Sequence, residues 1–221
     1  MVNTIFTTLV LPALALCAPH PQHRHGHFRF QNTATTATTA AVAATSTPIV
    51  ARDDVSTLSA SSGQVLLKNN CNYTVSVQPY PGSGCSCGEG GDVEPGSTWN
   101  DTLSDCSGGN TSLKVYREEA STPMQFEYGL ASNNVWYDMS FIDCVASGSD
   151  FSACAGGGWA MKANTNCHAY SCTGGSECCT QGYCDPEATG VDPAPNAGCG
   201  PDQGYTDSSD LGIVIELCSS S

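Results

Sequence analysis

The chain has 221 residues, with 7 Lys and Arg against 21 Asp and Glu, and a formal net charge of −14. A protein this acidic is repelled by phosphate, which argues against a nucleic-acid partner, an anionic membrane surface or an acidic substrate. Its 14 cysteines are typical of a disulfide framework, which persists in oxidising compartments. Length and composition therefore indicate one or two domains of an exported protein.

Residues 1–18 form a short apolar run that ends in small residues, which is the form of a secretory signal peptide. Cleavage after Ala15 is favoured, because cleavage after Ala18 would leave Pro19 at the new N-terminus. The run is too short to span a bilayer, and no later stretch is apolar for long enough. The sequence therefore predicts a secreted protein, extracellular or associated with a cell wall, with no membrane partner.

Two biased tracts occupy residues 19–61. The first has four histidines in the eight residues 20–27, and the second, 31–48, is almost entirely Thr, Ala and Ser. Neither tract can bury a core. A histidine cluster can bind copper or zinc, but we interpret the region as a solvated pro-segment or stalk, with Arg52 as a candidate processing site. We assign no metal here and expect no cofactor in the protein.

From residue 62 to 221, short runs of β-branched and aromatic residues alternate with clusters of Gly, Pro, Asn, Asp and Ser. This pattern predicts an all-β domain, large enough to close one core as a sandwich or barrel. The block 144–199 has many cysteines and few apolar residues, so we expect stapled loops against that core, with a short helical turn at 159–163. The expected strands are 65–69, 73–77, 112–117, 124–128, 135–142 and 212–217.

Several segments resemble those of thaumatin-like proteins and follow the same order. They are Lys68-Asn-Asn-Cys-Asn-Tyr-Thr-Val75, Pro95-Gly-Ser-Thr-Trp99, Trp136-Tyr-Asp-Met-Ser-Phe-Ile-Asp143, the cysteines Cys178, Cys179 and Cys184, and the ending 211–218. The resemblance covers about residues 64–219. It implies a thaumatin-like β-sandwich with a disulfide-stapled loop region, and a bridge between Cys71 and Cys218. The chain lacks the long cysteine-threonine-glycine-aspartate-cysteine signature of plant members, so it is most similar to the small fungal antigenic or yeast-phase-specific secreted group.

Some thaumatin-like proteins hydrolyse β-1,3-glucan in a cleft lined by an Arg, a Glu and three Asp, and the resemblance shows which positions match here. Asp138 and Asp143 stand at matching places, but Gln125 replaces the Glu, Val135 replaces an acid, and the segment with the Arg is missing. Hydrolysis needs two carboxyls facing one bond. Glu127, two residues further along the same expected strand face, is the candidate substitute.

We therefore expect a non-catalytic, cell-wall- or glycan-associated or antigenic protein, monomeric, with β-1,3-glucan or another wall polysaccharide as its partner. The candidate glycan contacts are Asp138, Asp143, Gln125 and Tyr137; the ring of Tyr137 belongs either on a sugar or in the core. Two alternatives stay open. One is an endo-β-1,3-glucanase that uses Glu127 with Asp138 or Asp143, and the other is a secreted effector with a protein partner. In so acidic a chain the two aspartates are also expected without any specific role.

The cysteine count is odd if Cys17 leaves with the signal peptide, since 13 then remain. One cysteine is then spare, bridges another chain, or pairs with a retained Cys17. Cys85 and Cys87 are too close together to pair with each other. Cys167 lies beside His168, which suggests a nucleophile or a zinc site, but cysteines at this density are expected in disulfides.

Three N-glycosylation sequons occur in the first half of the domain, at Asn72, Asn100 and Asn110. A sequon in an exported protein predicts a surface position that can carry a glycan. We therefore expect these three asparagines at the surface and expect some of them to be glycosylated.

Overall fold

The computed structural model describes residues 59–83, 88–105, 109–117, 120–146, 150–186 and 195–219. The expected signal peptide, the two biased tracts and the cysteines Cys17, Cys85, Cys87 and Cys106 lie outside these residues. The described residues form strands, turns and three short 3-10 helices, η1 (Ser176–Thr180), η2 (Pro201–Gln203) and η3 (Ser208–Asp210). They include no helix that is long and apolar enough to cross a membrane.

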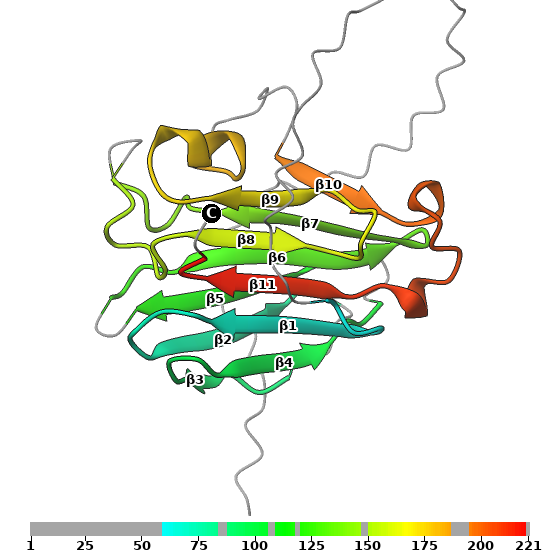
Figure 1. Ribbon diagram of the computed structural model, residues 1–221, viewed down its shortest axis with the longest axis horizontal. Coiled ribbons are helices and arrows are strands. Elements are labelled where there is room, and N and C mark those ends of the chain that lie inside the picture. Colours follow the sequence, from blue (N-terminus) through cyan, green and yellow to red (C-terminus); the bar gives the residue numbers. More distant parts are fainter. Residues whose placement is uncertain are drawn as a thin grey trace, which may run out of the picture.

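The strands form two sheets that lie over one another, with their strands in similar directions (Figure 1). Five strands make one sheet, in the order β4 (Thr98–Thr102), β1 (Gln64–Asn69), β11 (Ile213–Leu217), β8 (Trp159–Lys162) and β9 (Ala169–Cys172). Six make the other, in the order β10 (Asn196–Cys199), β7 (Asn134–Ser140), β6 (Met124–Ala131), β5 (Thr111–Arg117), β2 (Val75–Pro81) and β3 (Gly91–Val93). Only β1 and β11 pair in parallel within these sheets. The expected β-sandwich is confirmed.

The core lies between the sheets, where alternate residues of each strand meet. Successive side chains of a strand point to opposite faces, and the inward set is apolar and fully buried: Val65 and Leu67 from β1, Phe126 from β6, and Ile213 and Ile215 from β11 are all 0% exposed. The core includes a cluster of buried aromatic rings, with the Phe141 centroid 5.0 Å from Trp159 and 5.1 Å from Phe151, both edge to face.

Each of the six expected runs overlaps an observed strand: β1, β2, β5, β6, β7 and β11. The expectation of loops throughout 144–199 is wrong, because β8, β9 and β10 lie in that block. The expected helical turn at 159–163 is also wrong. Trp159 and Met161 are buried in the core, and β8 pairs with β11 on one side and β9 on the other, so its backbone groups are satisfied in the extended form.

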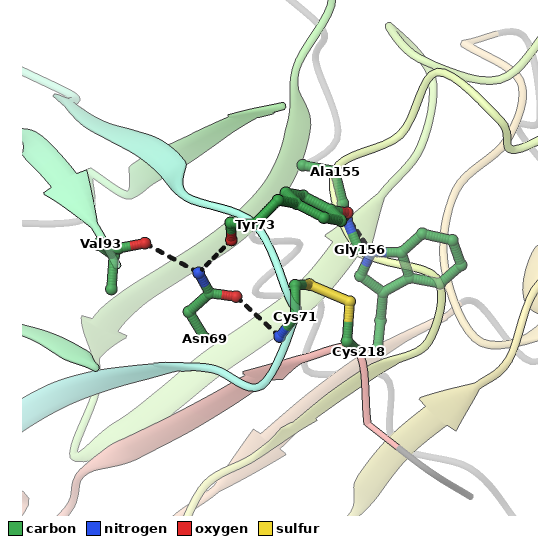
Figure 2. Close-up of a disulfide and its surroundings, with 8 residues drawn as sticks. Asn69, Cys71, Tyr73, Val93, Ala155, Gly156 and Cys218 are labelled. Atoms are coloured by element: carbon green, nitrogen blue, oxygen red, sulfur yellow. Dashed lines mark hydrogen bonds between the residues drawn. A yellow bond between two sulfur atoms is a disulfide. The ribbon is translucent and has the colours of Figure 1, made fainter. Parts of the chain in front are cut away.

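The bridge from Cys71 to Cys218 is confirmed, with an S–S distance of 2.01 Å and a sequence separation of 147. It joins the ends of the parallel strands β1 and β11 (Figure 2). Beside the bridge, the Asn69 side chain is fully buried, and both the nitrogen and the oxygen of its amide make hydrogen bonds. Its Nδ2 donates to the carbonyls of Tyr73, at 2.9 Å, and Val93, at 2.8 Å, and its Oδ1 accepts from the Cys71 amide at 3.0 Å.

The other bridges of the described residues lie in the second half of the chain. They are Cys144–Cys154, Cys167–Cys199, Cys172–Cys178 and Cys179–Cys184. The cysteine doublet therefore pairs in two different directions, and Cys167 is confirmed as a disulfide cysteine. No described cysteine is free. Cys167 precedes β9 and Cys199 ends β10, so this bridge links one edge of each sheet.

Candidate functional site

The candidate site lies on the outer face of the six-stranded sheet, the face that points away from the core. Leu113, Phe126 and Met139 fill the inner face, so the residues between them point outward. Strand register aligns these outward residues in two rows across the strands. One row is Tyr80, Ser112, Glu127, Asp138 and Asn196, and the next is Gln78, Lys114, Gln125 and Ser140.

Gln125 lies at the centre of a hydrogen-bonded chain on this face. Its side chain is only 5% exposed, and its Nε2 donates to Asp143 Oδ2 at 3.1 Å. Its Oε1 accepts from the Ser112 hydroxyl at 3.0 Å. Asp143 Oδ2 also lies 3.9 Å from Lys114 Nζ, and the two side chains are 30% and 28% exposed. Gln125 therefore fixes the position of a carboxylate that a ligand can reach, while it is itself out of reach.

Two tyrosines border the charged pair. The Lys114 ammonium lies 5.1 Å from the ring centroid of Tyr80, a cation–π contact. The Tyr80 hydroxyl donates to Gln78 Oε1 at 2.9 Å and is itself hydrogen-bonded to Tyr116. Burial, and then the neighbouring Tyr80, raise the pKa of Tyr116 to about 12, so the Tyr116 phenol is neutral at physiological pH. The tyrosines present rings and hydroxyls beside Asp143 and Lys114.

Glu127 and Asp138 form a carboxyl pair, directly opposite each other on β6 and β7. Asp138 is 1% exposed, and neither of its carboxyl oxygens has a hydrogen-bond partner among the described residues. Burial raises the pKa of Asp138 well above its ordinary range, and the charge of Glu127 raises it further. Burial also raises the pKa of Glu127 to about 7; Asp143 adds to the rise, while Lys114 and a hydrogen bond with Ser112 oppose it.

The segment after η1 covers the Asp138 end of the row. Tyr183 exchanges backbone hydrogen bonds with β7 and the turn after it, accepting from Phe141 at 2.7 Å and donating to Met139 at 2.9 Å. Its phenol accepts from Asn196 Nδ2 at 3.2 Å. Burial and the charge of Asp138 raise the pKa of Tyr183. This lid of backbone and phenol explains why Asp138 is inaccessible to solvent.

The structure brings Gln125, Glu127, Asp138 and Asp143 together but places Tyr137 elsewhere. Tyr137 is 0% exposed, its hydroxyl donates to the backbone carbonyl of His168, and its ring packs edge to face on Tyr170 at 6.1 Å. The proposed contact between Tyr137 and a sugar is therefore wrong, because the ring lies in the core. Asp138 and Gln125 are also buried, so neither is accessible to a ligand in this structure.

Several residues of the site were not singled out from the sequence: Ser112, Lys114, Tyr80, Tyr116 and Tyr183. They reach it through strand register and through the fold of the cysteine-rich block. Among the described residues, no group of three or more His, Cys, Asp and Glu side chains is placed to hold a metal ion.

The asparagines of the three sequons differ in their exposure to solvent. Asn72 and Asn100 are exposed, whereas Asn110 is half-buried. The backbone carbonyl of Asn110 accepts from Gly82 at 2.7 Å, so this asparagine belongs to a packed turn. Glycosylation stays a prediction, and the exposure favours Asn72 and Asn100 over Asn110.

The chain matches a family model and a number of solved structures, including MoHrip2 and TLXI. The family model of Bys1, described as Blastomyces yeast-phase-specific protein, matches residues 54–218. The protein elicitor MoHrip2 from Magnaporthe oryzae is 19% identical, with a TM-score of 0.50 over 71% of this chain and 99% of that one. The thaumatin-like xylanase inhibitor TLXI is 13% identical, with a TM-score of 0.42 over 70% and 98% of the two chains. No curated protein sequence matches the chain.

Proposed function

The chain belongs to the Bys1 family, Blastomyces yeast-phase-specific protein, and on that premise we propose a secreted, non-catalytic role in binding a neutral wall polysaccharide such as β-1,3-glucan. The thaumatin-like fold and its disulfides fit an extracellular protein, because bridges of this number persist outside the cytosol. The outer face of the six-stranded sheet is the proposed binding surface.

The observation that carries the proposal is the fixed contact of Lys114 with both Asp143 and the ring of Tyr80. A carboxylate accepts hydrogen bonds from sugar hydroxyls, an ammonium donates them, and an aromatic ring packs on the apolar face of a sugar. Gln125 holds Asp143 in place before any ligand arrives, so little side-chain freedom is lost on binding. A neutral ligand also avoids repulsion by the acidic surface.

The same geometry argues against hydrolysis by the Glu127–Asp138 pair. Glycoside hydrolysis needs two carboxyl groups that flank the scissile bond, one of them ionised or aimed at water. Asp138 is 1% exposed and lies beneath the segment of Tyr183, so it cannot reach a glycosidic bond. Glu127 can donate a proton, but Asp138 does not supply the second carboxyl that hydrolysis requires.

The test is co-sedimentation of the full, disulfide-intact chain with insoluble β-1,3-glucan, with cellulose and chitin as controls. We expect selective depletion from the supernatant, reduced several-fold by Asp143→Asn. Asp202→Asn is the matched control, because Asp202 is an exposed carboxyl on η2, outside the site. No depletion by any polysaccharide would overturn the proposal and favour an effector with a protein partner.

One observation favours the glucanase as a second candidate. The pKa of Glu127, raised to about 7 by burial, suits a general acid near neutral pH, and Asp143 is the remaining accessible carboxylate nearby. Reducing ends released from soluble β-1,3-glucan, and lost in Glu127→Gln, would establish hydrolysis. No release at high protein concentration would exclude it.

A further inference from the structure

Asp138 is a buried carboxyl group without an interaction partner. Its side chain is 1% exposed, and neither of its oxygens has a hydrogen-bond partner among the described residues. No Lys or Arg of these residues forms an ion pair with it, and Lys114, the ammonium on the same face, pairs with Asp143. An ionised carboxylate in such a place costs far more free energy than the neutral acid, so the group retains its proton.

The groups that face Asp138 supply no positive charge. Its partner on β6 is Glu127, whose own charge opposes a second one, and its partner on β10 is the neutral Asn196. Two phenols lie nearby, Tyr183 from the segment after η1 and Tyr170 from β9 of the other sheet. Burial raises the pKa of both, so they are neutral below pH 10. None of these neighbours can compensate an ionised Asp138.

A short segment, residues 181–184, keeps water away from Asp138, and we call it the lid. The Tyr183 backbone bridges to Ser140 on β7, and its phenol accepts from Asn196 Nδ2 at 3.2 Å. Because Asn196 pairs with Asp138 across the strands, the Tyr183 side chain runs from the level of Ser140 to the level of Asp138. The lid therefore covers the carboxyl with its backbone and a phenol ring.

The lid is attached to β7 by non-covalent contacts. Tyr183 makes two backbone hydrogen bonds there, donating to Met139 at 2.9 Å and accepting from Phe141 at 2.7 Å. Its disulfides lead elsewhere, since Cys179–Cys184 closes a short loop around the lid and Cys172–Cys178 ties the preceding turn to β9. The lid can therefore leave β7 without breaking a bridge, while both sheets keep their ladders and their core.

Gly182 allows the lid to lie this close to β7. A Cβ atom at this position would meet the Met139 carbonyl oxygen and a ring carbon of Phe141, each at 2.7 Å. Carbon atoms do not pack at such distances, and the carbonyl belongs to a paired strand that cannot yield. Alanine at position 182 should therefore lift the lid from β7 without changing any charge.

We propose that Asp138 carries a proton in the folded protein and that this proton locks the lid, so that its loss releases the lid from β7 and lets water reach the carboxylate. Opening the lid breaks two backbone hydrogen bonds, whereas opening the sheet would break whole ladders and expose the core. The lid is therefore the element that yields. The open form presents the carboxyl pair of Glu127 and Asp138 to solvent. This lock does not depend on the proposed function.

The first measurement follows the carbon-13 NMR signal of the Asp138 carboxyl in the full, disulfide-intact chain as pH is raised. We expect a protonated acid at pH 6, where an ordinary aspartate, with a pKa of about 3.9, is ionised. An Asp138 that is already ionised at pH 6 would overturn the inference. Because it uses the wild-type protein, this measurement does not depend on whether a variant folds.

The second measurement is hydrogen exchange at the amides of Tyr183 and Phe141, which donate the two hydrogen bonds of the lid. Each rate is compared with that of an unstructured chain at the same pH, which gives a protection factor without the ordinary acceleration by base. A carboxyl whose pKa is one unit higher under the closed lid than under the open lid shifts the opening equilibrium tenfold. We therefore expect protection to fall at least about tenfold across the interval in which Asp138 titrates, while the amides of β1 and β11 keep theirs. Unchanged protection of the lid would contradict the lock.

Two matched variants identify the group that controls the lid. Asp138→Asn keeps the size of the side chain without a titrating proton, so the lid should stay protected at every pH. Glu127→Gln leaves Asp138 in place and removes a like charge beside it, so the lid should still open, and at lower pH than in the wild type. The opposite pattern, a lid that opens in Asp138→Asn and stays closed in Glu127→Gln, would assign control to Glu127 and overturn the proposal.

Gly182→Ala tests the same link from the other direction. With the lid lifted, water reaches Asp138 at every pH, and its titration should move towards the ordinary aspartate value. The amides of β1 and β11 report whether the variant is folded. If it is not, Tyr183→Ser, which removes the covering ring and keeps the backbone, should give the same displacement. A folded variant with the Asp138 titration of the wild type would show that the lid does not keep the proton in place.

Discussion

Glu127→Gln should remove a pH dependence of folding that the wild-type protein carries. Burial raises the pKa of Glu127 from an ordinary value of 4.5 to about 7. Between these values the unfolded chain releases the Glu127 proton while the folded chain keeps it. The unfolded state then binds fewer protons, so the free energy of unfolding decreases as pH rises. Below the lower value both states are protonated, and above the higher value both are ionised, so the loss is confined to this window.

The size of the effect follows from the displacement of the pKa. One pKa unit corresponds to about 1.4 kcal/mol, so a rise from 4.5 to about 7 costs the wild type about 3 kcal/mol between about pH 4 and pH 8. Glutamine does not titrate and has nearly the same shape. The difference in unfolding free energy between Glu127→Gln and the wild type should therefore grow by about 3 kcal/mol in favour of the variant.

The assay is guanidinium chloride unfolding of the oxidised proteins at a series of pH values, with the slope of each transition compared. Asp202→Asn, at an exposed site on η2, removes the same charge and should give a curve parallel to the wild type. A Glu127→Gln curve that is also parallel to the wild type, within about 0.5 kcal/mol, would refute the claim that the folded protein holds this proton.

Two further predictions concern the framework. Replacing both Cys71 and Cys218 by Ala opens a loop of 147 residues and should lower the free energy of unfolding by about 5 kcal/mol, measured with denaturant. Replacing Cys144 and Cys154, which are 10 residues apart, should lower it by about 3 kcal/mol. Equal losses would contradict the argument from loop length. Asn69→Ala leaves two backbone carbonyls and one backbone amide unpaired in a buried site. It should lower the free energy of unfolding by about 3 kcal/mol or more, measured in the same way. A loss below about 1 kcal/mol would show that water replaces the side-chain amide.

The strands that the sequence predicts are runs of β-branched and aromatic residues bounded by clusters of turn-forming residues. Val115 and Tyr116 on β5 are residues of this kind, and β11 contains the three β-branched residues Ile213, Val214 and Ile215. β8 has the sequence Trp-Ala-Met-Lys and contains no β-branched residue, so the same criterion does not mark it as a strand. The strand is also short and has glycines and cysteines nearby, which are typical of loops. The partners that make it a strand, β11 and β9, are distant in sequence or join it through a turn.

Side chains alternate between the two faces of a strand, which explains why the predicted glycan contacts could not all lie on one face of the sheet. Tyr137 and Asp138 are consecutive on β7, so they must point to opposite sides of the sheet. The sequence alone was sufficient to exclude that combination. Lys114 and Tyr80 are different, because only the register of β2, β5 and β6 brings Lys114 into the row of Gln125 and Tyr80 into the row of Glu127. Register depends on long-range pairing, which a single sequence does not specify.

Gln125 connects two aspects of the site, because it is an amide at the position where the thaumatin-like pattern has a Glu and it also holds the neighbouring polar side chains in place. At the position where the thaumatin-like pattern has a Glu, the amide supplies a donor to Asp143 and an acceptor to Ser112 at the same time. A glutamate there could not donate to Asp143 when ionised, and it would bring a further negative charge close to Asp143 and Glu127. The amide removes a general acid and in exchange holds an accessible carboxylate in one orientation. That arrangement favours holding a hydroxyl-rich ligand over cleaving it, because binding needs fixed acceptors and donors, whereas hydrolysis needs a second carboxyl within reach of the bond.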